Sequence, residues 1–166
     1  MIQEHHTAGR QRKLTAVDGV RAGIPIAVGY LPIAIAFGLL ARSAGVAAEV
    51  AMLMSLIVFA GASQFVGINL LALGAVYGEI VLTTFLLNLR HFLMSASLAH
   101  RLEEGTGRIW RAILSFGITD ETFTVATLRD ERELSPQFLA ALNATAFVAW
   151  NAGTWAGLFL AEELPA

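Results

Sequence analysis

The sequence has no cysteine and few charged residues. Without cysteine, disulfides, thiolate metal ligands and cysteine nucleophiles are all excluded. Only 14% of the residues are charged, against roughly 25% in an ordinary soluble domain. A soluble chain of 166 residues needs a polar surface, and 56% hydrophobic residues cannot supply one. The composition therefore predicts an all-α integral membrane protein, a polytopic helical bundle.

Soluble-enzyme motifs are also missing from the sequence. There is no Gly-rich phosphate loop, no His-Glu-x-x-His zinc motif and no Gly-x-Ser-x-Gly nucleophile elbow. We therefore expect a protein that is not an enzyme and that uses neither a metal ion nor a prosthetic cofactor. An intramembrane enzyme has no support in the residues.

The polar residues at the start of the chain form a segment of their own. Residues 1–18 lack the apolar core of a cleaved signal peptide, and residues 19–166 are expected to form a single transmembrane domain. Arg10, Arg12 and Lys13 lie beside a hydrophobic stretch. They indicate membrane topology better than a nucleic-acid site, and they predict a cytoplasmic N-terminus.

Four stretches have the length of a membrane-spanning helix, about 20 residues. They are residues 22–41, 79–98, 109–128 and 138–161. The last one contains Gly153 and Gly157, whose spacing permits close contact with another helix. No internal repeat is evident in the sequence.

Residues 46–77 do not fit a single span. One helix of this length would be roughly 48 Å long, and two full passes would need about 40 residues. Its middle, Phe-Ala-Gly-Ala-Ser-Gln-Phe at 59–65, is small and polar in an apolar context. We predict two short arms with a break there, either a re-entrant hairpin or two thin spans.

The distribution of basic residues favours an even number of crossings by residues 46–77. Three basic residues would then lie outside, namely Arg42, Arg129 and Arg132, and seven would lie inside. A single crossing would change these counts to four and six. The seven inside residues are Arg10, Arg12, Lys13, Arg21, Arg101, Arg108 and Arg111.

Charged residues at membrane depth are the most informative feature of the sequence, because each costs about 2.5–3.5 kcal/mol at a bilayer centre. Arg90 and Asp120 are each twelfth in their predicted spans. We predict an ion pair of Arg90 with Asp120 or with Glu121, lining a polar cavity. The alternatives are a pair that only joins two helices, or an Arg90 side chain that reaches the headgroups.

Three further polar residues are candidates for a transport site. An imidazole titrates near neutral pH, so His91 could relay protons; Glu121 could also exchange a proton. His91 could equally be a neutral histidine bonded to a neighbouring helix. Asn88 is a candidate hydrogen-bonding partner of a substrate, although asparagines between membrane helices often serve only to join them.

The break at 59–65 could itself bind a ligand. A half-helix N-terminus inside a membrane offers free N–H groups and positive dipole character to an anionic group such as a carboxylate. Ser63 and Gln64 would add further donors. The alternative is a glycine-induced kink without a ligand.

These motifs together resemble the AzlC family, the large subunit of branched-chain amino acid exporters. The resemblance is carried, in order, by residues 59–65, Asn-Leu-Arg-His at 88–91 and Thr-Asp-Glu at 119–121, and it covers roughly residue 19 to the C-terminus. It implies export of hydrophobic amino acids across the cytoplasmic membrane of a bacterium or archaeon, with a small AzlD-like membrane subunit. Members usually continue beyond the position of Ala166.

We therefore expect a subunit of a secondary exporter of branched-chain or other hydrophobic amino acids, embedded in the bilayer and possessing several passes. A non-transporting membrane scaffold and an ion channel are the alternatives. The expected proton-coupling residues are His91 and Glu121. The expected substrate-binding residues are Ser63, Gln64, Asn88, Arg90 and Asp120.

Overall fold

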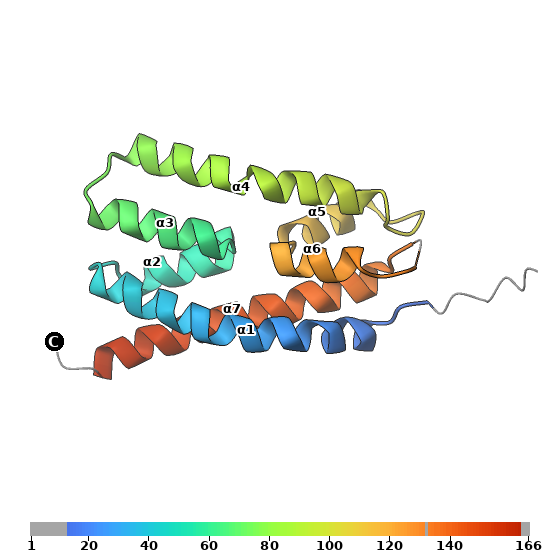
Figure 1. The fold of residues 1–166 in the computed structure, drawn as a ribbon, viewed down its shortest axis with the longest axis horizontal. Helices are drawn as coiled ribbons and strands as arrows, with labels where there is room; N and C mark the ends of the chain where they lie inside the picture. Colours follow the sequence, from blue (N-terminus) through green and yellow to red (C-terminus); the bar gives the residue numbers. More distant parts are fainter. Residues whose placement is uncertain (1–12, 132, 164–166) are drawn as a thin grey trace, which may run out of the picture.

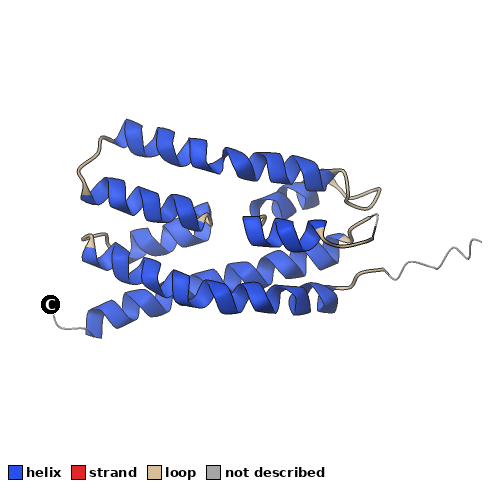
Figure 2. Cartoon of the chain, in the orientation of Figure 1, coloured by secondary structure: helices blue, strands red, loops and turns tan. Residues whose placement is uncertain are grey.

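The computed structural model describes residues 13–131 and 133–163. Regular structure in this part of the chain is entirely helical (Figure 1; Figure 2). The elements are α1 (Ala16–Ser43), α2 (Ala48–Leu53), the π-helical η1 (Met54–Val58), α3 (Gly61–Ala72), α4 (Tyr77–Ala99), α5 (Arg108–Phe116), α6 (Asp120–Thr127) and α7 (Pro136–Glu163). The predicted spans 22–41, 79–98 and 138–161 lie inside α1, α4 and α7.

Helices α1 and α7 form the most extensive helix–helix contact of the bundle. They run side by side in the same direction (Figure 1). Glycines bring them together. A Cβ atom built at Gly157 would lie 2.2 Å from the Ile35 carbonyl oxygen, and one at Gly19 would lie 2.3 Å from that of Phe138. Gly153 likewise faces Ala34. The predicted role of Gly153 and Gly157 in close packing is confirmed.

Residues 46–77 form two short helical arms with a break between them, as predicted. The first arm consists of α2 and η1, the chain reverses at Phe59 and Ala60, and α3 runs back beside the first arm (Figure 1). Phe59 has φ of 43°, in the left-handed region that residues other than glycine rarely adopt. The break is thus shorter than predicted, because Gly61 already begins α3.

Residues 109–128 are not one span, so that prediction was wrong. Helix α5 ends at Phe116 and α6 begins at Asp120, which makes a second hairpin. Gly117 ends α5, and Thr119 caps α6, because its side chain accepts a hydrogen bond from the Thr122 N–H. The two short arms and their turn together have the length of one span, so length did not reveal the break.

The second hairpin changes the side on which Arg129 lies. Its backbone oxygen accepts a 2.8 Å hydrogen bond from Arg101, at the end of the bundle where α4 finishes. The prediction that Arg129 and Arg101 lie on opposite sides was therefore wrong. Arg132, placed with Arg129 in that prediction, lies outside the described residues. We call this end of the bundle the basic end; it carries Lys13, Arg21, Arg101, Arg108, Arg111 and Arg129.

The architecture repeats although the sequence shows no repeat. A long helix followed by a hairpin occurs twice, as α1 with α2–α3 and as α4 with α5–α6. Corresponding elements begin about 60 residues apart: Ala16 and Tyr77, Ala48 and Arg108, Gly61 and Asp120. Figure 1 shows that α1 and α4 run in opposite directions and that the two hairpins enter from opposite ends. The two units therefore have inverted topology, an arrangement that many transporters share.

The hairpin arms are about half as long as a membrane is thick. The arms of the first hairpin contain 11 and 12 residues, and those of the second contain 9 and 8. At 1.5 Å per residue they reach roughly 12–18 Å into a hydrocarbon core of about 30 Å. Helices α1 and α4 are long and apolar enough to cross a membrane. The hairpin tips consequently meet near mid-depth, where the rings of Phe59 and Phe116 are 6.4 Å apart.

Single cysteines in this cysteine-free chain test the two hairpins. We expect Glu104→Cys and Asp130→Cys, both exposed, to react with a membrane-impermeant thiol reagent added to the same side of the membrane. Val76→Cys, between the first hairpin and α4, should react only from the other side. Labelling of the Asp130 and Glu104 variants from opposite sides would mean that residues 109–128 cross the membrane after all.

Candidate functional site

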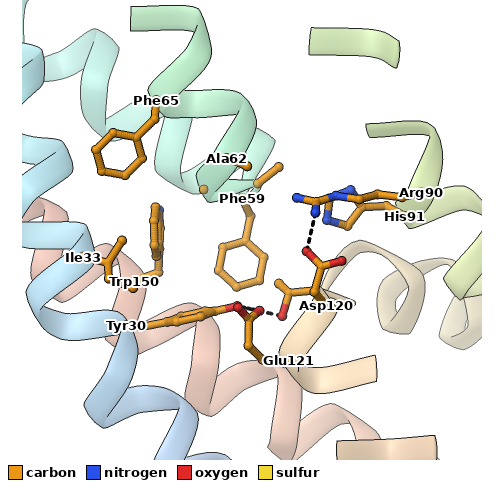
Figure 3. A pocket seen from close by; sticks show the side chains of 13 residues that line it. Tyr30, Ile33, Phe59, Ala62, Phe65, Arg90, His91, Asp120, Glu121 and Trp150 are labelled. Carbon is orange, nitrogen blue, oxygen red and sulfur yellow. Dashed lines mark hydrogen bonds and ion pairs between the residues drawn. The ribbon is translucent and has the colours of Figure 1, made fainter. Parts of the chain in front are cut away.

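The two hairpin tips enclose a cavity of about 290 Å³ between the long helices. Figure 3 shows side chains from both tips and from α1, α4 and α7 around it. Its polar lining residues are Tyr30, Arg90, His91, Thr119, Asp120 and Glu121. Its apolar lining residues are Ile33, Phe59, Ala60, Gly61, Ala62, Phe65 and Trp150.

An ion pair joins α4 to the tip of the second hairpin across this cavity. A guanidinium nitrogen of Arg90 lies 2.8 Å from a carboxylate oxygen of Asp120 (Figure 3). Of the two pairings predicted for Arg90, the structure contains this one. The side chains of Arg90 and Asp120 are 43% and 46% exposed, so both charged groups remain accessible to a solute in the cavity.

Glu121 is held by a residue that the sequence reasoning missed. The Tyr30 hydroxyl, in the middle of α1, donates a hydrogen bond to the Glu121 carboxylate, and it lies 2.8 Å from the Thr119 hydroxyl. Tyr30 is 8% exposed and its ring packs edge-on against Trp150. A single phenol within an otherwise apolar span was the available signal, because a buried tyrosine hydroxyl needs a polar partner.

His91 follows Arg90 on α4 and also lines the cavity, with its ring beside the Arg90 guanidinium in Figure 3. The structure thus brings together four of the predicted site residues: Arg90, His91, Asp120 and Glu121. The prediction places Arg90 and Asp120 together because two full antiparallel spans would bring both to mid-depth, and that is not how they meet. Asp120 and Glu121 reach the cavity because they begin the half-helix α6.

Gln64 lies behind the cavity wall and has partners on two sides. Its side-chain oxygen accepts a 3.0 Å hydrogen bond from the Trp150 indole, and its nitrogen donates to Ser55 at 2.9 Å. Ser55 in turn is 2.8 Å from the Thr154 hydroxyl. The side chains of Gln64, Ser55 and Thr154 are completely buried. This network fastens the first hairpin to α7.

Two more predicted residues also lie outside the lining of the cavity. Ser63 is buried and donates a hydrogen bond to Asn88 on α4. Ser63, Gln64 and Asn88 therefore have partners within the protein, and their contact with a substrate stays a prediction. What they do in the structure is to hold the first hairpin against its neighbours.

The start of α3 forms one wall of the cavity. Ala60, Gly61 and Ala62 line it, and no side chain caps this helix. The first N–H groups of a helix lack partners within the helix, so here they are available to an anionic group. Gly61 is required, because a Cβ atom at this position would lie 2.6 Å from the Trp150 ring.

The cavity thus combines one guanidinium, two carboxylates and free helix N–H groups with an aromatic and aliphatic wall. Among the residues that the structure describes, no three His, Asp or Glu side chains are grouped closely enough to hold a metal ion. The lining thus offers charged groups of both signs beside an apolar wall.

Comparison with known proteins identifies the family. The family model described as AzlC protein matches residues 25–164. The chain belongs to the AzlC family. This confirms the resemblance drawn from the motifs at 59–65, 88–91 and 119–121, and it makes the chain a member of a transport-associated family of membrane proteins rather than of an enzyme family.

Individual relatives agree with the AzlC assignment. The chain is 34% identical to the inner membrane protein YgaZ of Escherichia coli over 153 residues, 90% of this chain and 62% of YgaZ. It is 38% identical to an uncharacterized membrane protein of Archaeoglobus fulgidus over 146 residues, 88% of this chain and 63% of that protein. The chain therefore spans about three fifths of the length of these two relatives.

A third relative carries a functional name. The chain is 36% identical over 103 residues to the branched-chain amino acid transport protein AzlC of Bacillus subtilis, which covers 61% of this chain and 39% of that protein. No solved structure matches the chain.

Replacement of Gln64 tests the network behind the cavity. Gln64→Leu leaves the buried Trp150 indole N–H without its acceptor and removes the bond to Ser55, so we expect a loss of about 1–3 kcal/mol in stability. Asn69→Leu is the control, because Asn69 is exposed on the same helix and its side chain donates to the Phe65 carbonyl, one turn earlier in that helix. Thermal unfolding of the two purified variants should differ clearly; equal midpoints would show that the network contributes little.

Proposed function

We propose that the chain is the large subunit of a secondary transporter that exports branched-chain or other hydrophobic amino acids. The observation that carries this proposal is the accessible Arg90–Asp120 pair in a cavity whose other wall is aromatic and aliphatic. The name of the Bacillus subtilis relative supports the same substrate class. The cavity volume, about 290 Å³, suits a small solute.

A zwitterionic amino acid can enter the ion pair without leaving a buried charge unpaired. Its carboxylate pairs with Arg90 and also accepts hydrogen bonds from the free N–H groups of α3. Its ammonium pairs with Asp120. One ion pair is replaced by two, so each of the two charged side chains keeps a partner of opposite charge when the solute binds. The apolar side chain then packs against Phe65 and Trp150.

Export against a gradient needs an energy source, and proton exchange is the proposed one. Glu121 and His91 both line the cavity beside the proposed ammonium site. The hydrogen bond from Tyr30 holds the Glu121 carboxylate at the edge of the cavity. No prosthetic cofactor is required in this scheme.

The charge distribution supports a multi-pass protein of the cytoplasmic membrane with a cytoplasmic N-terminus. In the described residues, the basic end carries six basic side chains, whereas Arg42 lies at the opposite end. Basic residues accumulate on the cytoplasmic side of membrane proteins. We therefore propose that the basic end faces the cytoplasm and that a small AzlD-like membrane subunit completes the transporter.

Efflux of preloaded isoleucine, leucine and valine tests the proposal, with this chain expressed alone and with the small subunit. We expect saturable efflux with both chains. Arg90→Gln and Asp120→Asn should each lower it by at least about tenfold, because loss of a charge-assisted bond at the binding site costs on the order of 1.5–3 kcal/mol. Arg108→Gln, an exposed arginine at the start of α5, is the control and should leave efflux unchanged.

Membrane content of each variant separates the outcomes. If Arg90→Gln accumulates normally and transports normally, Arg90 does not bind the substrate carboxylate. If Arg90→Gln and Asp120→Asn fail to accumulate while the double variant Arg90→Gln/Asp120→Asn does accumulate, the pair joins helices and the scaffold hypothesis gains. Flux that does not saturate would indicate a channel.

A further inference from the structure

The two hairpins have corresponding places in the inverted repeat, but they are held in different ways. We propose that the second hairpin, α5–α6, is a gate that opens the cavity toward the basic end, whereas the first hairpin, α2–α3, is a fixed wall. The proposal rests on the transport function proposed above. It is carried by the contacts of each hairpin.

Buried bonds hold the first hairpin to the long helices. Gln64 bonds Trp150, Ser55 lies 2.8 Å from Thr154, and Ser63 bonds Asn88. These side chains are at most 3% exposed, apart from Asn88. A solute in the cavity reaches none of the hydrogen-bonding groups of Gln64, Ser55 and Ser63, so its arrival leaves this attachment intact.

Within the second hairpin, the turn and α6 contribute buried Ile118, Thr122 and Ala126, whereas α5 has few buried contacts. Leu114 is the buried residue of this helix, whereas Ile109, Trp110 and Ile113 are 78%, 52% and 57% exposed. Near its start, α5 is joined to α4 by a 3.1 Å hydrogen bond from Arg111 to the Ala99 carbonyl. Toward the tip, its polar contacts with the rest of the bundle are a 2.9 Å hydrogen bond from Asn143 to the Leu114 carbonyl and a weak one, at 3.5 Å, from Ser95 to the Ser115 carbonyl. Few buried apolar contacts are typical of segments that move.

The tip of the second hairpin is attached through the groups that would bind the substrate. Asp120 pairs with Arg90 on α4, and Glu121 accepts from Tyr30 on α1 (Figure 3). A zwitterion that pairs with both Arg90 and Asp120 therefore replaces the direct ion pair between them, which is one of the bonds that hold the tip. Binding thus removes one of the two bonds that hold the tip, and the hydrogen bond from Tyr30 to Glu121 is the second.

The base of the second hairpin, in contrast, is fixed by Arg101 at the end of α4. Its guanidinium donates to the carbonyl oxygens of Thr127, Arg129 and Glu131 at 3.1, 2.8 and 2.6 Å. A segment held at its base and released at its tip swings about that base. Since α5 and α6 enter from the basic end, the swing opens the cavity to that end (Figure 1).

Reversible cross-links between engineered cysteines test which hairpin moves. Ser95→Cys/Ser115→Cys joins the second hairpin to α4, and Ser55→Cys/Thr154→Cys joins the first hairpin to α7. Oxidation should reduce leucine efflux at least about tenfold in the first pair, with recovery after reduction, and should leave the second pair unchanged. The opposite pattern, or inhibition of both pairs, overturns the assignment. Matching single-cysteine variants control for oxidation itself.

A labelling experiment measures the gate without transport. Ala62→Cys lines the cavity, so its reaction with an impermeant thiol reagent from the side of the basic end reports opening. Adding Tyr30→Phe and Asp120→Asn should raise this rate on the order of tenfold, because both latches are lost. Should that variant not accumulate, Tyr30→Phe alone should still raise the rate.

The two readouts distinguish the failure of the gate from that of the transport function. An unchanged labelling rate, or faster labelling only from the opposite side, overturns the gate. Faster labelling from the basic side supports the gate even if no variant exports leucine, and absence of export then counts against the proposed function.

Discussion

Charged groups and unpaired backbone groups are both costly inside a membrane, and this structure collects both in one place. Two helices are interrupted, at Phe59–Ala60 and at Gly117–Thr119, and the interruptions face each other across a single cavity. Irregular backbone at membrane depth is tolerated where protein covers it or where it lines a cavity. The Arg90–Asp120 pair lies at this same point, so one cavity receives both the helix breaks and the charged pair.

The long helices make that enclosure possible. The close contact of α1 with α7, through Gly19, Gly153 and Gly157, makes these two helices a surface against which the hairpin tips pack. Tyr30 on α1 and Trp150 on α7 extend from this surface and line the cavity. The glycines thus act on the site indirectly, because they set the depth at which a phenol and an indole meet the two tips.

Much of the fold could be predicted from the sequence, because apolar runs of about 20 residues report their own length. The same measure revealed the first hairpin, since 32 residues fit neither one pass nor two. It failed for the second hairpin, whose short arms sum to one ordinary span. The capping side chain of Thr119 was the local signal, but a threonine in an apolar run is common and says little alone.

The candidate site was predicted in part for a similar reason. Arg90, His91, Asp120 and Glu121 stand out because charge is rare in membranes, and all four line the cavity. Neutral polar residues are harder to assign, since hydrogen bonds within the protein can satisfy them completely. Ser63 and Gln64 are examples: their place at a helix break drew attention, yet their partners are Asn88, Trp150 and Ser55.

The two hairpins occupy corresponding positions in the inverted repeat, but their polar side chains have different partners. The first hairpin directs its polar side chains into the protein, and the second directs Asp120 and Glu121 into the cavity. Divergence of this kind explains why the repeat is invisible in the sequence: what the two units share is the order and length of their elements. The shared arrangement of helices forms the cavity, and the residues found only in the second hairpin, Asp120 and Glu121, supply its carboxylates.

The central claim is that Arg90 binds the carboxylate of a zwitterionic substrate. The measurement that tests it most directly is calorimetric binding of leucine, of isoamylamine, which lacks the carboxylate, and of 4-methylpentanoate, which lacks the ammonium, to the purified protein and to Arg90→Gln. The account predicts that the wild type prefers leucine to both analogues and that Arg90→Gln no longer distinguishes leucine from isoamylamine. If Arg90→Gln prefers leucine over isoamylamine as strongly as the wild type does, another group binds the carboxylate and the account is wrong.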